Sequence, residues 1–241
     1  MNKWFDTWFD TKYYHILYKN RDFSEAENFI SNLVNDLKVD KNGTVLDLAC
    51  GKGRHSIYLN KLGFNVIGVD LSKESIEFAN RYKNDKLSFF VHDMREPMAN
   101  KSFNFVFNLF TSIGYFDDVK ENEKMLKSID SYTAEDGVLV IDFMNAYKVI
   151  NNLVKSEIKV VDGITFNISR EVINGFIVKT ITFSDAGKDY KFQEKVQALQ
   201  LSDFERYLKS TNFSIYKTVG DYNLGNFDLE NSNRLIIFAK K

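Results

Sequence analysis

Two aspartates flank a short glycine turn, at a spacing that could bind a ligand carrying both cationic and hydroxyl groups. Asp47 lies near the end of the apolar run 44–49, Gly51 and Gly53 follow it, and Asp70 comes directly after the apolar run 65–69. Glycines between a strand and a helix let the backbone approach a ligand closely. An acid at the end of the second strand can accept hydrogen bonds from both ribose hydroxyls. The pattern therefore predicts a site for an adenosine-bearing ligand.

The residues around the glycines favour one class of adenosine-bearing ligand over others. A dinucleotide fingerprint needs Gly or Ala three residues after Gly53, but Ser56 stands there, and Asp47 would repel a pyrophosphate. NAD and oxidoreductase chemistry are therefore disfavoured, and the turn does not match a P-loop either. A carboxylate beside the turn instead suits a sulfonium and an α-ammonium, whose attached carboxylate would lie near the N–H groups that begin the helix.

The elements that must position these residues alternate between strand and helix as far as residue 145. Aromatic residues recur at helical spacing from Trp4 to Tyr18, and Ser24 with Glu27 forms a capping box before a second helix. Short apolar runs then predict strands at 44–49, 65–69, 87–91, 103–109 and 138–143, with helices between them, of which the last covers 125–132. Strands that alternate with helices predict a parallel sheet covered on both faces.

After Asn145 the pattern changes to β-rich segments. The runs 157–161, 164–172, 176–183 and 190–199 are expected to form hairpins, with tight turns at Asp162-Gly163 and Asn174-Gly175. A capping box at Ser202 and Glu205 predicts a helix, and the strands 213–219 and 234–239 close the chain. The predicted fold is α/β: a Rossmann-like, doubly wound seven-stranded sheet with N-terminal helices and an antiparallel β insert. Residues 1–145 and 200–241 form the ligand-binding domain, with 1–40 as a helical lid, and 146–199 form the insert.

Composition excludes several classes of protein. The 241 residues carry 32 basic and 33 acidic side chains, so the chain lacks the positive field expected of a protein that binds mainly nucleic acid or anionic membranes. Cys50 is the sole cysteine, which excludes an internal disulfide and a thiolate zinc cluster. The apolar runs are of strand length, and the N-terminus lacks a signal-peptide pattern. We expect a cytoplasmic protein with no metal site.

Residues 47–53 resemble the first motif, D/E-x-G-x-G-x-G, of the class I S-adenosylmethionine-dependent methyltransferases, with Ala49 in place of the first glycine. The resemblance covers about 36–143 strongly and the last two strands weakly. It implies S-adenosylmethionine as cofactor and S-adenosylhomocysteine as product. The cofactor contacts that it implies are Asp47, Ala49 and Gly51 at the methionine moiety, Gly53 in the turn, Asp70 at the ribose, Leu71, Asp93 and Met94 at the adenine, and Asn108 and Leu109 beneath the reactive methyl.

The segment 108–116, directly after the fourth strand, is expected to contact the methyl acceptor. It lacks D/N-P-P-Y, and since Pro97 is the sole proline, the adenine-N6 and glutamine methyltransferase signature and a Pro-Cys nucleophile are both absent. The loop 111–115 resembles that of small-molecule N-methyltransferases such as the amino-sugar dimethyltransferases and the glycine or sarcosine group. Those enzymes often have a histidine where this chain has Tyr115. Alignment and desolvation can supply most of the acceleration, so an invariant base is not required.

The resemblance also implies that the aromatic segment 13–21 lies over the cofactor, where Tyr14, with Tyr115, would position the reactants; the alternative is that these aromatics fix a helix to the sheet. The insert is expected to roof the acceptor site, or else to form a dimer through an edge strand. We therefore predict a methyltransferase acting on a small molecule, with nitrogen preferred to oxygen or carbon, as a monomer or homodimer that binds neither membrane nor nucleic acid. The alternatives are an RNA or protein methyltransferase and a catalytically silent regulatory protein that binds S-adenosylmethionine or S-adenosylhomocysteine.

Overall fold

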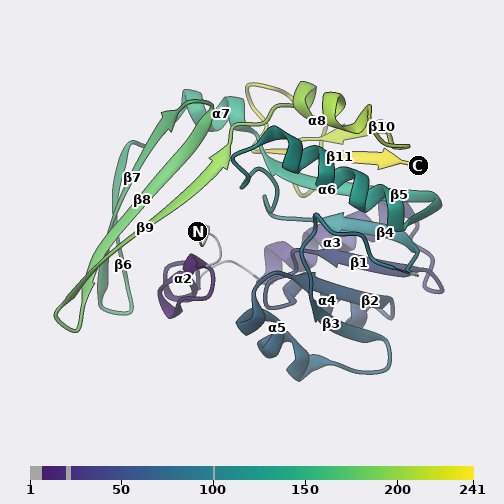
Figure 1. The fold of residues 1–241 in the computed structure, drawn as a ribbon, viewed down its shortest axis with the longest axis horizontal. Helices are drawn as coiled ribbons and strands as arrows, with labels where there is room; N and C mark the ends of the chain where they lie inside the picture. Colours follow the sequence, from purple (N-terminus) through teal and green to yellow (C-terminus); the bar gives the residue numbers. More distant parts are fainter. Residues whose placement is uncertain (1–6, 20–22, 100) are drawn as a thin grey trace.

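The computed structural model describes residues 7–19, 23–99 and 101–241, and it places them in two β-sheets (Figure 1). The larger sheet has seven strands in the order β10-β11-β5-β4-β1-β2-β3, and the smaller has four in the order β6-β7-β8-β9. This arrangement confirms the predicted fold class.

The seven-stranded sheet is parallel from β3 to β5, and β11 runs antiparallel to both of its neighbours. Because the carboxyl ends of parallel strands meet at one edge, the loops after these strands lie together, where ligands bind in open α/β sheets. The strands are β1 (Thr44–Leu48), β2 (Asn65–Asp70), β3 (Leu87–Val91), β4 (Phe103–Asn108), β5 (Thr133–Met144), β10 (Ser214–Val219) and β11 (Arg234–Lys240).

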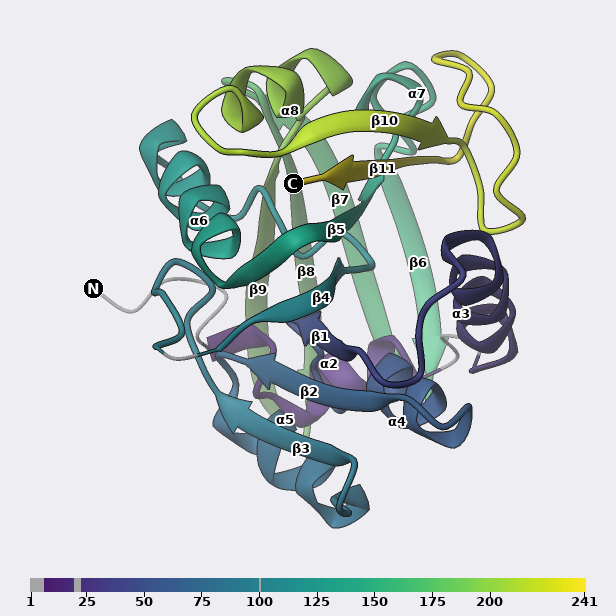
Figure 2. The ribbon, with the colours of Figure 1, turned by 90° about the vertical axis from the view of Figure 1, so that its right-hand side faces the viewer.

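Helices cover both faces of this sheet (Figure 2). The first group is α3 (Phe23–Leu37), α4 (Arg54–Lys61) and α5 (Lys73–Ala79), which leads into the short 3₁₀ turn η1 (Asn80–Tyr82); the second is α6 (Val119–Tyr132) and α8 (Leu201–Leu208). Leu33 and Leu59 are fully buried on the first side, and Ile129 and Phe204 on the second. Burial of one such side chain contributes about 1.5–3 kcal/mol, so both helical layers hold the sheet.

The insert follows the short helix α7 (Ala146–Asn151) and consists of β6 (Ser156–Val161), β7 (Ile164–Ile173), β8 (Phe176–Asp185) and β9 (Lys188–Gln197), paired antiparallel throughout. Both predicted turns are present, with φ of 48° and 77° at Asp162-Gly163 and 49° and 79° at Asn174-Gly175. Positive φ at both central residues matches the twist of a hairpin. A third such turn, Ala186-Gly187, was not predicted because Ala gives no turn signal.

The helix α2 (Lys12–Leu17) packs on the insert. Thr11 caps it by accepting a hydrogen bond from the Tyr14 N–H. Trp8, Tyr13 and Leu17 are at most 6 % exposed and form one apolar cluster with the insert strands. The apolar face of this N-terminal segment is therefore covered by the insert sheet. Trp4, at the start of the predicted helical pattern, lies outside the described residues.

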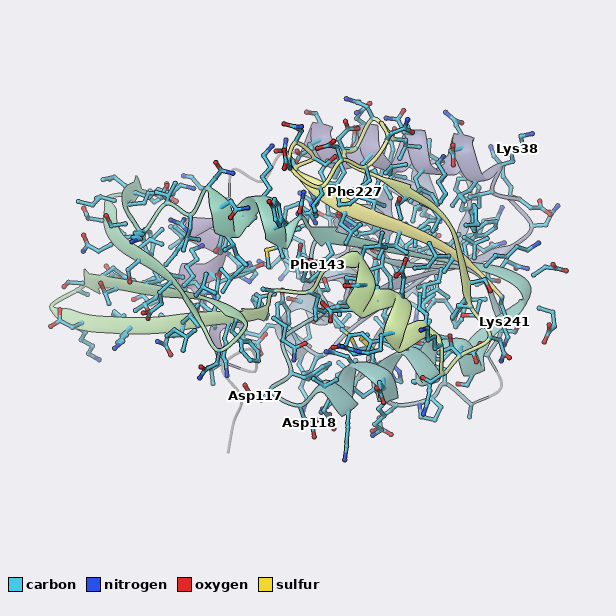
Figure 3. The ribbon with its side chains drawn as sticks, turned by 90° about the horizontal axis from the view of Figure 1, so that it is seen from above. Lys38, Asp117, Asp118, Phe143, Phe227 and Lys241 are labelled. Carbon is cyan, nitrogen blue, oxygen red and sulfur yellow. The ribbon has the colours of Figure 1, made fainter. Side chains whose placement is uncertain are left out.

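The carboxyl edge of the large sheet faces the insert. Seen from above, Phe143, near the end of β5, lies toward the insert, whereas Lys38 and Lys241 lie at the opposite end of the molecule (Figure 3). The Gln197 N–H donates to the Gly114 carbonyl (2.7 Å), and Lys195 forms an ion pair with Asp117. The insert is thus attached to the loop that follows β4.

Several predicted boundaries are wrong. Helix α3 already includes Ser24, so this residue cannot be the cap before the helix. Helix α8 begins at Leu201, and Gln200, whose N–H donates to the Asp203 carboxylate (2.9 Å), occupies the cap assigned to Ser202. Helix α6 begins at Val119, well before the expected 125, because Asp118 accepts a hydrogen bond from the Lys120 N–H and so caps the polar first turns.

The described residues contain neither a membrane-spanning helix nor a cluster of metal-binding side chains. No helix in 7–19, 23–99 or 101–241 is both long and apolar enough to cross a membrane. Within the same ranges, no group of three or more His, Cys, Asp or Glu side chains is arranged to hold a metal ion.

Candidate active site

Asp47 is a buried carboxylate at the end of β1. Its side chain is 1 % exposed and accepts a hydrogen bond from the Ser56 Oγ (2.5 Å). Burial raises the pKa of Asp47 from 3.8 to about 6. Ser56 occupies the position where a dinucleotide-binding fingerprint needs Gly or Ala. In the structure it is the hydrogen-bond partner of the Asp47 carboxylate. The charge of Arg54 opposes the rise in the pKa of Asp47, but burial outweighs it, so the ionised carboxylate is destabilising by itself and suits a cationic ligand.

The glycine turn after β1 is left-handed at three positions, with φ of 62° at Ala49, 55° at Gly51 and 81° at Gly53. The Cys50 N–H donates to the Val69 carbonyl (2.9 Å), which fixes the turn against β2. A Cβ atom built on Gly51 would meet no atom within 4 Å, so space is open beside this residue. Ala49 is the one residue of the three that has a steric penalty in this conformation.

Asp70 connects the turn to the end of β2. Its carboxylate accepts hydrogen bonds from the N–H groups of Gly51 (2.8 Å) and Ser72 (2.8 Å), and burial raises its pKa. Leu71 beside it is 44 % exposed. The Ser72 hydroxyl also donates to Asp10, so the N-terminal segment reaches this loop directly. Asp47, the glycine turn and Asp70 therefore form one continuous site.

Asp93 lies after β3 and is engaged by Arg95. The Arg95 Nε lies 2.9 and 3.1 Å from the two Asp93 carboxylate oxygens, and its guanidinium also pairs with Glu121. Burial opposes ionisation of Asp93, but the hydrogen bonds from Arg95 outweigh it and lower the pKa of Asp93. Met94 is partly buried against the apolar core. No pattern in the sequence indicated Arg95 as the partner of this acid.

Asn108 ends β4 and is completely buried. Its Nδ2 donates to the Leu48 carbonyl (3.0 Å), which joins β4 to β1 beside Asp47. Its Oδ1 has no hydrogen-bond partner among the described residues. A buried amide oxygen without a donor is costly, so it can receive a donor from a ligand. Leu109, which follows, is 3 % exposed.

The next two residues, Phe110 and Thr111, are both left-handed, with φ of 66° and 59°. Asp142 on β5 holds them: its carboxylate accepts from the Phe110 N–H (2.9 Å), and its carbonyl accepts from the Thr111 N–H (2.9 Å). Arg234 on β11 donates from Nε to Asp142 (2.7 Å) and from Nη2 to the Thr111 hydroxyl (2.9 Å). Sequence reasoning missed both Asp142 and Arg234.

Tyr115 and Tyr14 are joined through an aromatic ring. The Tyr115 hydroxyl donates to the Thr111 carbonyl (2.6 Å). The ring of Phe9 lies 5.7 Å from that of Tyr115 and 4.9 Å from that of Tyr14. Aromatic residues therefore extend from the loop after β4 to the helix α2, in a position to exclude water from the edge of the sheet.

The end of α2 is held by Glu194 on β9. Its carboxylate accepts from the Trp8 Nε1 (2.8 Å) and the Tyr18 hydroxyl (2.6 Å), and Lys179 lies 3.4 Å from its second oxygen. These polar contacts, together with the apolar cluster beneath them, fix the N-terminal segment to the insert.

Comparison with known proteins identifies the family to which this site belongs. The family model described as a methyltransferase domain matches residues 39–203, which include the glycine turn, both aspartates and the loop after β4. The chain belongs to the methyltransferase domain family. This methyltransferase is 26 % identical over 206 residues to YqeM of Bacillus subtilis, and the match covers 78 % of this chain and 80 % of that one.

Two further similarities extend this result. A dTDP-3-amino-3,4,6-trideoxy-α-D-glucopyranose N,N-dimethyltransferase of Streptomyces venezuelae is 25 % identical over 124 residues, 52 % of each chain. The crystal structure of an S-adenosylmethionine-dependent methyltransferase from Clostridium acetobutylicum superposes with a TM-score of 0.79 over 95 % of each chain, at 21 % identity, and so has the same fold. The predicted enzyme class and cofactor are confirmed: the protein is an S-adenosylmethionine-dependent methyltransferase.

Proposed function

We propose that the protein transfers the methyl group of S-adenosylmethionine to a nitrogen atom of a small molecule. The observation that carries the proposal is the buried Asp47, whose pKa burial raises, beside the open left-handed turn at Gly51, because a cationic ligand would stabilise this carboxylate next to a backbone that a ligand can approach. The aromatic wall from Tyr115 to Tyr14 supports a small acceptor enclosed away from water.

Each predicted cofactor residue has a defined task in this proposal. Asp47, Ala49 and Gly51 would hold the methionine moiety, Gly53 would allow the turn, and Asp70 would bind the ribose with the lone pairs that Gly51 and Ser72 leave free. Leu71, Asp93 and Met94 would contact the adenine. Asn108 and Leu109 would lie beneath the methyl group. The Asn108 Oδ1 would also accept a hydrogen bond from the α-ammonium of the methionine moiety. The cofactor supplies an electrophilic methyl group, and the chain aligns the acceptor with it.

The acceptor side is formed by two segments that are distant in sequence. We place it between residues 1–40 as a lid and 146–199 as a cap, over the domain formed by 1–145 and 200–241. The Gln197–Gly114 hydrogen bond attaches the cap to the loop after β4, so the cap is joined to the segment that would touch the acceptor. Tyr14 and Tyr115 would position the reactants. The amino-sugar N,N-dimethyltransferase among the relatives supports nitrogen as the methylated atom.

The cofactor assignment is tested by calorimetric titration of wild type and of Asp70→Ala with S-adenosylmethionine, S-adenosylhomocysteine and NAD. Loss of a carboxylate that binds ribose should weaken the first two ligands by about 10- to 100-fold, since a hydrogen bond to a charged group contributes about 1.5–3 kcal/mol. Asp85→Ala, at an exposed acid on the turn before β3, is the matched control and should bind as wild type does. Unchanged affinity in Asp70→Ala would refute the ribose assignment.

The acceptor assignment is tested by incubating the enzyme with S-adenosylmethionine and a panel of acceptors, and measuring S-adenosylhomocysteine. The panel contains glycine, sarcosine, a dTDP-linked amino sugar and the corresponding dTDP sugar with hydroxyl in place of the amine. Turnover of an amine without turnover of its hydroxyl counterpart is the expected result. Faster methylation of the hydroxyl compound would contradict the choice of nitrogen.

A further inference from the structure

The loop that follows β4 holds two non-glycine residues in succession in a left-handed conformation. This region is sterically unfavourable for L-residues, and Thr111, which is branched at Cβ, is especially unsuited to it. Such strain persists only where the surrounding contacts enforce it, and it is concentrated at sites of binding and catalysis. The loop is the one that the proposed function places next to the transferred methyl group.

The contacts that enforce the strain converge on Asp142. Its carboxylate is 1 % exposed and accepts from the Phe110 N–H, the Arg234 Nε and the Tyr222 hydroxyl (3.2 Å), while its carbonyl accepts from the Thr111 N–H. Arg234 reaches the Thr111 hydroxyl with its other branch, a fork that a lysine could not reproduce. The β5 and β11 strands therefore hold both left-handed residues through side chain and backbone together.

These contacts also determine where the Phe110 carbonyl points. In a trans peptide the C=O points opposite to the N–H of the same plane. Because the Thr111 N–H points to the backbone of β5, the Phe110 carbonyl points away from β5, and the next strands on that side of β4 are β1 and β2. The Phe110 ring lies 5.1 Å from the guanidinium of Arg54, at the start of the helix after β1, and 5.8 Å from that of Arg234 on β11, so Phe110 reaches the residues of the glycine turn while it is held from β11.

We propose that Asp142 and Arg234 are positioning residues that aim the Phe110 carbonyl oxygen at the place of the transferred methyl group, where it accepts a hydrogen bond from an amine N–H. The inference rests on the proposed function and adds to it the feature that orients the nitrogen. A carbonyl at this point binds an amine hydrogen and orients the nitrogen lone pair toward the methyl carbon, while offering nothing to an acceptor without a hydrogen to donate.

The test uses sinefungin, a cofactor analogue in which a carbon bearing an amine replaces the sulfur bearing the methyl group, and S-adenosylhomocysteine, which has nothing at this position. Calorimetry gives the affinity of each ligand for wild type and for Asp142→Asn. The ratio of the two affinities isolates the contacts at the methyl position. We expect the preference for sinefungin to fall about tenfold in Asp142→Asn, with the affinity for S-adenosylhomocysteine within about twofold of wild type.

A merely structural role would lower both affinities together, and an unchanged ratio in a folded variant would overturn the proposal. Thr111→Gly, which permits positive φ without strain, should restore most of the ratio when added to Asp142→Asn. The matched control is Asp130→Asn, which removes a partly buried partner of Lys241 at the other end of the sheet and should leave the ratio unchanged.

A second variant and a second measurement keep the test decisive. If Asp142→Asn does not fold, Arg234→Lys retains the charge and loses the fork, so the same fall in ratio is expected. Amide hydrogen exchange of Phe110 and Thr111 should be slow in wild type and at least about tenfold faster in either variant, because each amide would lose its buried acceptor more often. Exchange that is equally slow in the variants would also overturn the proposal. If wild type binds neither ligand, the proposed function fails, and exchange still tests the loop.

Discussion

Replacement of Asp47 by asparagine should stabilise the ligand-free protein while removing its affinity for the cofactor. The folded chain raises the pKa of this carboxyl from 3.8 to about 6, chiefly through burial. At about 1.4 kcal/mol for each pH unit, this rise means that ionised Asp47 destabilises the folded state by about 3 kcal/mol. Asparagine has nearly the same shape and can still accept a hydrogen bond from Ser56, but it carries no charge.

The sign of the pH dependence follows from proton binding. Between pH 3.8 and about 6 the folded protein holds a proton on Asp47 that the unfolded chain has released, so wild-type stability falls as pH rises through this window and the loss is complete above about 6. The Asp47→Asn variant lacks this titration. Its free energy of unfolding, relative to that of wild type, should therefore increase by about 3 kcal/mol from about pH 4 to about pH 7.

Urea unfolding monitored by circular dichroism at four pH values across this range measures the difference, and Asp85→Asn controls for removal of one surface carboxylate. Calorimetry at neutral pH should show that Asp47→Asn loses most of its affinity for S-adenosylmethionine. The reasoning is refuted if the stability difference between variant and wild type is the same at every pH, because Asp47 would then have an ordinary pKa in the folded protein.

Three further predictions concern the turn, the second strand and the N-terminal segment. Ala49→Gly should raise stability by about 0.5–1 kcal/mol in thermal unfolding, because relief of strain at φ 62° exceeds the added entropy of the unfolded chain; a lower melting temperature would contradict this. Gly68→Ala should lower stability by about 1–3 kcal/mol in urea, because its Cβ would lie 2.5 Å from the Phe89 ring, and unchanged stability would show that the ring moves freely. Glu194→Gln should speed tryptic cleavage of the N-terminal segment several-fold, because Tyr18 loses a charged partner; an unchanged rate would show that apolar packing alone holds α2.

Much of the fold could be predicted because its signals are local. The strand, glycine turn and helix around Gly51 show their type within a few residues, and Asp162-Gly163 and Asn174-Gly175 specify hairpins by their conformational preference. The exact ends of the helices could not be predicted as well, because the geometry of one side chain, and not its residue type, decides which residue is the cap, as at Gln200. The short helix α7 has too few residues to show a period.

The residues of the candidate site likewise fall into two groups, those that a local sequence pattern indicates and those that depend on contacts between distant segments. Asp47 and Asp70 occupy ends of neighbouring strands, so one local strand–turn–helix–strand motif contains both. The Asp142–Arg234 pair joins positions 92 residues apart, and its significance depends on backbone angles at Phe110 and Thr111 that no residue preference indicates. The same is true of Glu194, which meets Tyr18 across 176 residues. Contacts of this kind depend on how the sheets are placed, which sequence periodicity does not specify.

The docking of α2 on the insert has a consequence for biosynthesis. The aromatic residues of α2 emerge from the ribosome well before their packing partners on β8 and β9, as the 172-residue separation of Tyr13 and Asp185 illustrates. At about 5–20 residues per second this interval lasts on the order of 10–30 s. Throughout it Trp8, Tyr13 and Leu17 lack their native cover, so the nascent chain exposes an apolar segment that chaperones can bind.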